Sequence, residues 1–503
     1  MPVKAPKTSR HLEVERKFDV VESTVSPSFE GIAAVDHVDK SPTESLDATY
    51  FDTPAHDLAR NKITLRRRTG GHDAGWHLKL PAGPEARTEV RAPLDAGESG
   101  DKDTVPDELR DIVLAIVREK PLEPVARIST ERETQVLYGA DGAALAEFSN
   151  DHVTAWAAGN SDAPPAEQEW REWELELVEG NGAADAELLG RLSNRLLDAG
   201  AAPAGHASKL ARVLGATAQP DETREPADPV HRAVAEQVAE LLVWDRAVRA
   251  DAYDAVHQMR VTIRKIRSLL ADSQDASESS DIAFIQDELR ELGNVLGVAR
   301  DAEVLAERYQ QALDRLPPEL VRGRIRERLV DGARRRYQTG LRRSLIAMRS
   351  QRYFRLLDAL DAWVAEVPAA AAGHEPEPVT LEAAYQKVRK AAKAAAEVQP
   401  GAEHDLDLAL HRIRKRAKRL RYTAAATGAT RVSEQAKVIQ TLLGDHQDSV
   451  VSREHLSHQA EAAHTAGEDT FSYGLLYQQE ADLAERCRQQ LDEALRKLAK
   501  AVR

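Results

Sequence analysis

Apolar and polar residues alternate along much of the first 180 residues, the period that places successive side chains on opposite faces of a β-strand. In residues 11–20, Leu12 and Val14 share one face while Glu13 and Glu15 lie on the other. Eight such stretches are predicted as strands: residues 11–20, 46–52, 62–68, 76–80, 87–92, 125–137, 143–149 and 170–178. Many strands joined by short turns predict an antiparallel sheet or barrel.

Helical periodicity appears at 107–118 and 186–199, and it dominates the chain after residue 230. Residues 216–229 carry three prolines and no apolar period, which is typical of a linker. A second break lies at 366–380. We therefore predict an α+β domain at 1–215, a linker at 216–229, and an all-α domain at 230–503 with two helical-bundle repeats, about 230–365 and 381–503.

The helical region contains an internal repeat. VHQMRVTIRKIRSLL, from Val256, aligns with LHRIRKRAKRLRYTA, from Leu410, and each copy is followed by an LG-containing segment, LGVARD and then LGDHQD. Both copies keep a histidine and four basic residues at the same spacing. These residues are His257, Arg260, Arg264, Lys265 and Arg267 in the first copy, and His411, Arg414, Lys418, Arg419 and Arg421 in the second. A duplicated helical unit is the simplest explanation.

Composition narrows the function classes. The one cysteine, Cys487, excludes an intrachain disulfide and a cysteine-based zinc site. No apolar run resembles a signal peptide or a membrane span, so we expect a cytoplasmic protein without a membrane partner. The net charge of −14 argues against nonspecific nucleic-acid binding. The first 220 residues carry 25 Lys and Arg against 38 Asp and Glu, whereas the remaining 283 are nearly balanced.

The charged faces of the strands allow two interpretations. They could be the wet side of an open sheet, which is common, or the interior of a closed barrel. Their charges segregate by strand, with acidic residues on the first and last strands and basic residues between them. Such an interior would suit triphosphate, which needs several converging Arg and Lys side chains and a divalent cation held by carboxylates.

The first domain resembles the CYTH family, the triphosphate tunnel metalloenzymes. The ExExK signature matches Glu13, Glu15 and Lys17, and residues 49–68 resemble the family's YFDT and LRxR stretch. WHLKL, EWELEL and the Ser208-Lys209 pair also match. The resemblance implies an eight-stranded antiparallel tunnel with flanking helices that hydrolyses or cyclises a triphosphate with Mg²⁺ or Mn²⁺.

The resemblance also implies roles for individual residues. The catalytic residues would be Glu13, Glu15 and Lys17. The metal ligands would be Glu13, Glu15, Asp151, Glu172, Glu174 and Glu176, with Glu147 an open alternative to Asp151. The residues that bind phosphate would be Lys17, Arg66, Arg68, Lys79, Arg91, Arg127, Arg132 and Lys209. Arg132 is the weaker candidate because its alternation is out of step with Arg127. His11, His72 and His77 are expected at the surface.

The repeated histidine helices resemble the CHAD family, which is associated with inorganic polyphosphate. On a helix, positions i, i+3 and i+7 share a face, so His257, Arg260 and Arg264 form one stripe. Two opposed stripes would form a cationic groove, and solvated helix faces are the alternative. The scarcity of aromatic residues argues against single-stranded nucleic acid as a partner. The cytoplasm is the expected location, and polyphosphate granules are a candidate site within it.

Three functions follow from these patterns. The leading hypothesis is a metal-dependent triphosphatase acting on inorganic triphosphate or short polyphosphate, with a helical module that binds inorganic polyphosphate. The first alternative is a noncatalytic polyphosphate receptor. The second is a tunnel enzyme for an organic triphosphate, by ATP cyclisation or thiamine triphosphate hydrolysis.

Overall fold

The computed structural model describes residues 9–83, 85–96, 104–158, 167–178, 183–215, 229–274, 280–366, 381–399 and 401–502. The predicted linker, through residue 228, and the predicted break, from residue 367, lie outside the described residues. The chain forms two compact units, considered separately below. The barrel unit comprises Met1–Ala255 with Met348–Val367, and the helical unit comprises Val256–Ala347 with Pro368–Arg503.

The barrel unit contains the strands β1 (Ser9–Val20), β2 (His37–Lys40), β3 (Glu44–Asp52), β4 (Thr64–Thr69), β5 (Gly75–Pro81), β6 (Ala86–Ala92), β7 (Glu123–Tyr138), β8 (Ala144–Ala157), β9 (Glu167–Leu177) and β10 (Ala202–Pro203). Its helices are α1 (Asp57–Arg60), α2 (Asp107–Ile112), α3 (Leu114–Val117), α4 (Ala183–Asp198), α5 (Lys209–Leu214), α6 (Pro229–Arg249) and α10 (Gln351–Ala365). The eight predicted strands are all present, and the short strands β2 and β10 were not predicted.

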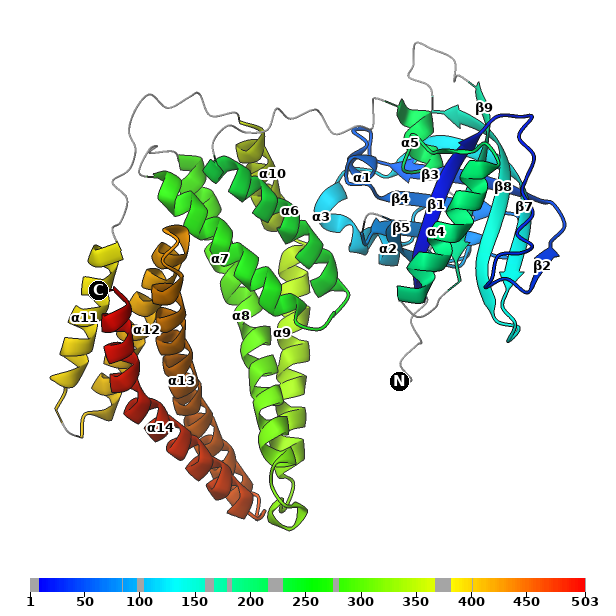
Figure 1. Ribbon diagram of the computed structural model, residues 1–503. Helices are drawn as coiled ribbons and strands as arrows, with labels where there is room; N and C mark the ends of the chain where they lie inside the picture. The colour runs from blue at the N-terminus through cyan, green and yellow to red at the C-terminus, as the bar shows by residue number, and fades with distance from the viewer. Residues whose placement is uncertain are drawn as a thin grey trace. The chain divides into compact units, whose positions relative to one another are not determined.

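Eight antiparallel strands close into a barrel, in the order β1-β6-β5-β4-β3-β7-β8-β9. Closure depends on β1, whose first half, Ser9 to Val14, pairs with β6 and whose second half, Glu15 to Val20, pairs with β9. The eight-stranded tunnel and the all-α region that follows it are therefore confirmed (Figure 1).

Helices cover the outer apolar faces of the strands. Leu188, Leu192 and Leu196 form one stripe of α4 and pack on Phe148 and Trp173, all of them buried. Segments α2 and α3 pack in the same way on the outer faces of β4, β5 and β6. Each fully buried Leu or Phe contributes about 1.5–3 kcal/mol, so this covering favours the closed barrel over an open sheet.

The inner face is not polar throughout. Ala48, Ile128 and Ala155 are neighbours across three paired strands and are buried together with Leu210 and Val213 of α5. Alternation places this cluster on the inner side of the strands, since the outer side at this level carries charged residues such as Arg127. Apolar side chains therefore fill one part of the barrel beneath α5, and the polar cavity occupies the remainder.

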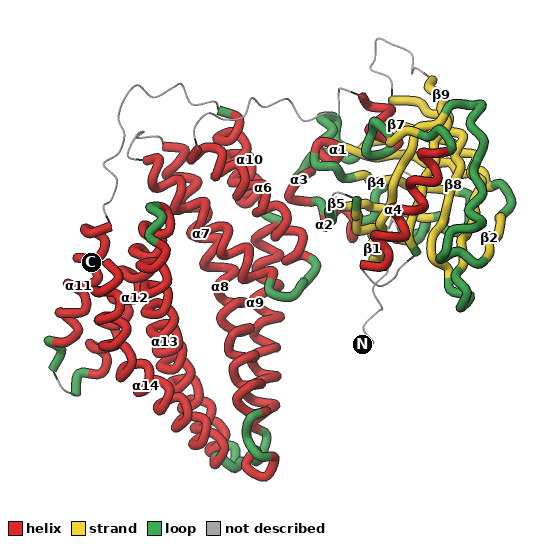
Figure 2. Tube along the Cα trace, viewed as in Figure 1, coloured by secondary structure: helices red, strands yellow, loops and turns green. Residues whose placement is uncertain are grey.

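The helical unit is built from α7 (Ala255–Gln274), α8 (Ser280–Asp314), α9 (Gly332–Met348), α11 (Leu381–Ala396), α12 (Glu403–Ala426), α13 (Thr430–Thr465) and α14 (Phe471–Val502) (Figure 2). The first copy of the repeat falls on α7 and α8, and the second falls on α12 and α13. None of the helices in the described part of the chain combines the length and apolarity that crossing a bilayer requires.

Candidate functional site: a charged cavity inside the barrel

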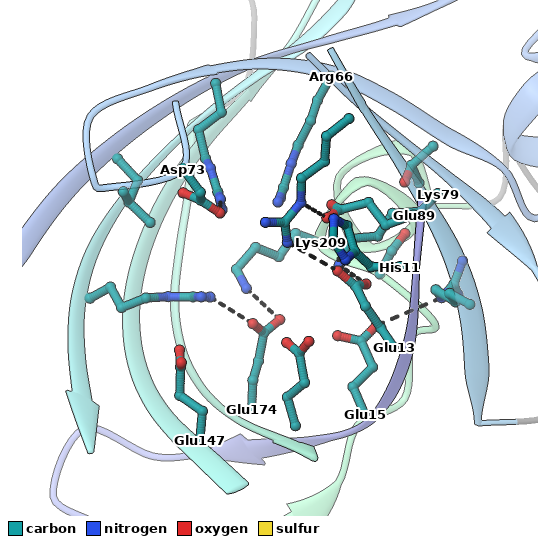
Figure 3. Close-up of a pocket in the computed structure, with 18 of the residues that line it drawn as sticks. His11, Glu13, Glu15, Arg66, Asp73, Lys79, Glu89, Glu147, Glu174 and Lys209 are labelled. Atoms are coloured by element: carbon teal, nitrogen blue, oxygen red, sulfur yellow. Dashed lines mark hydrogen bonds and ion pairs between the residues drawn. The ribbon is translucent and has the colours of Figure 1, made fainter. Parts of the chain in front are cut away.

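The charged faces of the strands point into the barrel. They surround a cavity of about 360 Å³, and the side chains of Glu13, Glu15, Arg66, Lys79 and Glu174 converge on it (Figure 3). Strict alternation on β1, β4, β5 and β9 brings these side chains to the cavity, because every second residue of each strand faces inward. The interior interpretation of the charged faces is the one that the geometry supports.

The cavity is lined by carboxylates and cations in equal numbers. The cations are Lys17, Arg66, Arg68, Lys79, Arg87, Arg91, Arg132 and Lys209. The carboxylates are Glu13, Glu15, Glu44, Asp73, Glu89, Glu147, Glu174 and Glu176. A bare polyanion would face repulsion from the acidic side, whereas a complex of phosphate with divalent cations presents both signs of charge. The lining therefore suits a metal–phosphate complex.

Three carboxylates gather at one side of the barrel. Ligand atoms of Asp151, Glu172 and Glu174, from β8 and β9, lie within 4.8 Å of one another. Lys209 Nζ lies 2.8 Å from Asp151 Oδ2 and 2.7 Å from an oxygen of each glutamate. Arg132 binds two of them, with Nε 2.8 Å from Asp151 Oδ1 and Nη2 2.6 Å from Glu174 Oε2. These cations compensate a concentration of negative charge that burial would otherwise make costly.

Lys209 owes its position to the cap of α5. Ser208 has extended backbone dihedrals, and its hydroxyl accepts a hydrogen bond of 3.1 Å from the Ala211 backbone N–H. A serine in this geometry starts a helix. The helix therefore begins at Lys209 and directs its buried ammonium group to the carboxylates.

The ExExK residues of β1 form the second charged group. Lys17 Nζ lies 3.0 Å from Glu15 Oε2 and also binds Glu174, which connects β1 to the carboxylates of β9. Burial alone would raise the pKa of Glu15, but Lys17 and Lys79 lower it to about 2. Burial raises the pKa of Glu13 despite its contact with Lys79. One carboxylate of the pair is thus fully ionised, while its neighbour holds its charge less easily.

Arg66 and Arg68 of β4 line the opposite wall. Arg66 Nη1 donates a hydrogen bond of 3.3 Å to the Tyr50 hydroxyl, and Arg68 is paired with Asp73. Burial and the neighbouring Arg66 and Arg132 lower the pKa of Arg68. Guanidinium groups that repel one another in a confined space gain stability from a bound anion.

The residues present fit a divalent cation. Asp151, Glu172 and Glu174 supply the hard oxygen ligands that Mg²⁺ and Mn²⁺ prefer. Glu13 Oε2 and Glu172 Oε1 are buried and accept no hydrogen bond from the described residues, although ammonium groups lie near both. Both oxygens are ion-paired with an ammonium group, and a carboxylate oxygen has a second lone pair, so each atom can accept a further ligand.

Comparison with known proteins places both units in known families. The CYTH domain model matches residues 11–196, and the CHAD domain model matches residues 232–457. Two uncharacterized proteins of Mycobacterium tuberculosis, from strains CDC 1551 / Oshkosh and H37Rv, are each 74% identical to the chain over 514 residues, covering 100% of it and 99% of the relative. The chain belongs to the CYTH–CHAD family.

Solved structures also resemble parts of the chain. The CHAD domain from Ricinus communis is 25% identical, with 53% of this chain and 90% of that chain covered and a TM-score of 0.40. PptA from Streptomyces chartreusis is 21% identical, with 53% and 98% covered and a TM-score of 0.41. The Hippeastrum protein HpAC1, described as having a dominant triphosphatase activity, is 17% identical, with 40% and 93% covered and a TM-score of 0.26.

Within the CYTH barrel, one predicted phosphate-binding residue lies outside the cavity. Arg127 points outward, pairs with Asp47 across β3 and β7, and its side chain is 62% exposed. Arg132, the weaker candidate from the sequence, lines the cavity. The two arginines are five positions apart, so on one strand they must face opposite sides, and the sequence alone did not reveal which faced inward.

The open choice between Asp151 and Glu147 has a geometric answer. Both lie on β8, four residues apart and on the same face. Asp151 is fully buried within the cluster of three carboxylates. Glu147 lines the cavity and is paired with Glu176 on the neighbouring strand β9. Asp151 is therefore the better placed of the two to join Glu172 and Glu174 around a cation.

Glu176, a predicted ligand, lines the cavity apart from these three carboxylates. Burial raises its pKa to about 7, and the nearby Glu13, Glu15 and Glu174 contribute to the rise.

His77 is not at the surface as expected. It is 1% exposed, with Nδ1 2.9 Å from Glu89 Oε1 and Nε2 3.0 Å from the Asp73 carbonyl oxygen. Of the other two histidines, His11 lies at the cavity and His72 is 81% exposed. His77 sits on β5 two residues from Lys79, so the same alternation that predicted Lys79 also places His77 inside the barrel.

Arg87 and Glu89 line the cavity and were not predicted as site residues. Arg87 Nε lies 3.7 Å from Glu15 Oε1, and Glu89 is 1% exposed and binds Arg91. Both are in phase with Arg91 on β6, so the alternation of RTEVR could have identified them.

In the CHAD helices the two stripes lie close together. Arg264 of α7 is partly exposed to solvent. Its pKa is lowered by desolvation, then by Arg260 and by Arg414 of the second repeat. Lys418 of α12 is affected in the same way by Arg264 and Arg414. Like charges from two segments about 150 residues apart are thus held within electrostatic range, as a cationic groove requires.

Proposed function

We propose that the CYTH domain is a metal-dependent triphosphatase for inorganic triphosphate or short polyphosphate. The observation that carries this proposal is one cavity in a closed barrel, lined by Glu174 together with Arg66, Arg68 and other cations. Asp151 and Glu172 lie buried beside Glu174 and complete a cluster of three carboxylates. Triphosphate hydrolysis needs both groups, since the phosphate oxygens and the cation that neutralises them bind together.

Residues of different chemistry would have different roles in this reaction. Arg66, Arg68 and Arg132 would donate N–H groups to phosphate oxygens, for which a planar guanidinium is well suited. Asp151, Glu172 and Glu174 would hold Mg²⁺ or Mn²⁺, which when bound supplies charge neutralisation and polarises phosphate oxygens. Glu13 and Glu15, together with Lys17, would orient water for in-line attack on a terminal phosphorus.

Phosphate release from inorganic triphosphate, measured with Mg²⁺ and with Mn²⁺ across a pH series, tests this proposal. Glu13→Gln and Glu15→Gln are each expected to lower kcat by about a hundredfold or more. The matched control is Asp47→Asn, which removes a carboxylate charge on the outer side of β3 and should retain activity. Full turnover in both glutamine variants would overturn the catalytic assignment.

The same assay separates the alternative functions. ATP and thiamine triphosphate, supplied in parallel, test the organic substrates. Tight binding of triphosphate without turnover of any candidate would favour a noncatalytic receptor.

We also propose that the CHAD domain binds inorganic polyphosphate, which would direct the protein to cytoplasmic polyphosphate granules. The two cationic stripes support this, because a long polyanion is held by point charges and by the release of its counterions. Affinity is expected to fall steeply as salt is raised. Competition by RNA at equal phosphate concentration decides between the two polyanions, and displacement of polyphosphate by RNA would contradict the proposal.

A further inference from the structure

Each CHAD repeat brings a glycine against an arginine of its cationic stripe. In the first repeat, a Cβ atom added to Gly297 of α8 would lie 3.0 Å from Nη1 and 3.4 Å from Cζ of Arg260. In the second, a Cβ atom added to Gly444 of α13 would lie 3.6 Å from Nε of Arg414. These are the glycines of the repeated LG segments, so the two contacts occupy equivalent positions in the duplicated unit.

The two guanidinium groups share a second property. Arg260 Nη1 and Arg414 Nε are buried atoms that lack a hydrogen-bond partner among the described residues. The equivalent aspartates lie nearby, since Asp301 Oδ1 is 3.6 Å from Arg260 Nη1 and Asp448 lies within electrostatic range of Arg414. Buried guanidinium N–H groups without an acceptor are costly, which points to a ligand that supplies one.

The glycines explain how the arginines reach this position. A side chain at Gly297 would occupy the space against which the Arg260 guanidinium rests, and the flexible end of the arginine would have to move away. Glycine also lowers helix stability in the middle of α8 and α13. The close approach of an arginine side chain is a physical reason for a glycine at each of these two positions.

We propose that Gly297 and Gly444 are positioning residues that seat Arg260 and Arg414, one from each repeat, so that both guanidinium groups donate to neighbouring phosphates of one polyphosphate chain. This inference rests on the proposed polyphosphate binding and adds how the two arginines of the groove are held in position. A guanidinium held in place loses little rotamer freedom on binding, so it contributes more affinity than a mobile one.

A pair of alanine variants on one helix tests the first repeat. Gly297→Ala is expected to weaken binding of sodium polyphosphate to the full-length protein by about tenfold, the loss of one charge-assisted hydrogen bond. Gly293→Ala is the matched control, because its Cβ would meet only Ile263 Cγ2, at 3.8 Å. Both variants should unfold at the wild-type temperature or higher, since alanine favours the helix. Isothermal titration calorimetry and thermal melts provide the two measurements.

The second repeat requires a larger side chain. Alanine at Gly444 would make ordinary van der Waals contact with Arg414, so Gly444→Ala should bind almost as wild type. Gly444→Leu should displace the guanidinium and weaken binding, and circular dichroism shows whether the helices remain intact.

A double-mutant cycle distinguishes positioning from a general structural effect. In an Arg260→Ala background, Gly297→Ala should cause no further loss of affinity, because the group that it displaces is gone. Additive losses would overturn the inference, as would wild-type affinity in Gly297→Ala. If the wild-type protein itself does not bind polyphosphate, the proposed function of the CHAD domain fails instead.

Discussion

At the scale of single residues, the direction of a side chain decides its role more than its charge does. Arg127 and Arg132 lie on one strand and have the same chemistry, yet one binds Asp47 on the outer surface and the other binds Asp151 and Glu174 inside the barrel. Their opposite placement makes them a matched pair for experiments on the barrel.

The first prediction uses this pair. Arg132→Ala should lower kcat/KM for triphosphate by about a hundredfold, because a cavity guanidinium is lost where phosphate charge must be held. Arg127→Ala should leave kcat/KM within about twofold, since an exposed ion pair contributes little. Arg132→Lys, which keeps the charge but loses the two-pronged geometry, should fall between them. Equal losses in the two alanine variants would contradict the inward placement of Arg132.

His77 carries the second prediction, on pH and stability. Burial lowers its pKa to about 4 in the folded state, whereas the unfolded chain titrates near 6.5. Between these values the unfolded chain binds more protons, so the free energy of unfolding should fall as pH drops from 6.5 to 4. The loss through this group is at most about 3 kcal/mol. Glu176, whose pKa is raised to about 7, has the opposite effect: through this group the free energy of unfolding rises as pH drops over an overlapping range.

The measurement is therefore a difference between proteins. His77→Gln should show a flatter dependence than wild type over this window, and the exposed His72→Gln should match wild type. Urea unfolding followed by tryptophan fluorescence is suitable, because all six tryptophans of the chain lie in the barrel unit. Parallel profiles for wild type and His77→Gln would show that His77 is not held neutral.

At the scale of elements, the turn after β3 depends on one buried carboxylate. Asp52 accepts hydrogen bonds from the backbone N–H groups of Thr53, Leu58 and Ala59, at 2.7, 2.9 and 2.9 Å. This network fixes the short helix α1 and the approach to β4. It gives a structural reason for aspartate in the YFDT stretch, distinct from any role in catalysis.

The third prediction follows from that network. Asp52→Ala leaves three backbone donors without their acceptor and should lower the free energy of unfolding of the barrel unit by about 3 kcal/mol or more. Asp52→Asn keeps one acceptor oxygen and should cost less. Tryptophan-monitored urea unfolding at pH 7 ranks the variants, and an unchanged midpoint in Asp52→Ala would contradict the capping role.

The elements also show what the sequence could predict. Alternation located the eight barrel strands because each has one apolar and one polar face. It did not locate β2 and β10, which are four and two residues long and too short for a period. Alternation also did not show that Ala48 and Ile128 fill the barrel interior beneath α5, since packing inside a closed barrel depends on contacts between distant strands. The prediction that Arg127 faces the cavity was wrong for the same reason, because the pairing of β7 with other strands decides which of its faces points inward.

At the scale of the whole molecule, two helices of the predicted helical domain pack with the barrel. In the barrel unit, Asp111 of α2 accepts hydrogen bonds from Arg249 of α6, at 3.1 Å, and from Arg349, at 2.7 Å. Arg118 binds Asp358 and Asp361 of α10. The compact unit that contains the CYTH barrel therefore includes α6 and α10, and its stability should depend on both.

The fourth prediction tests this dependence in the full-length protein. Asp111→Ala removes the acceptor shared by Arg249 and Arg349, and Arg249 is 1% exposed, so its lost contact is not replaced by water. Amide hydrogen exchange in α2, α6 and α10 should accelerate by about tenfold, equivalent to about 1.4 kcal/mol of local stability. Exchange in α12, α13 and α14 of the helical unit should be unchanged. Asp314→Ala, which removes an exposed ion pair with Arg326, is the control and should alter neither set. Acceleration confined to α2 would show that α6 and α10 are stabilised independently of the barrel.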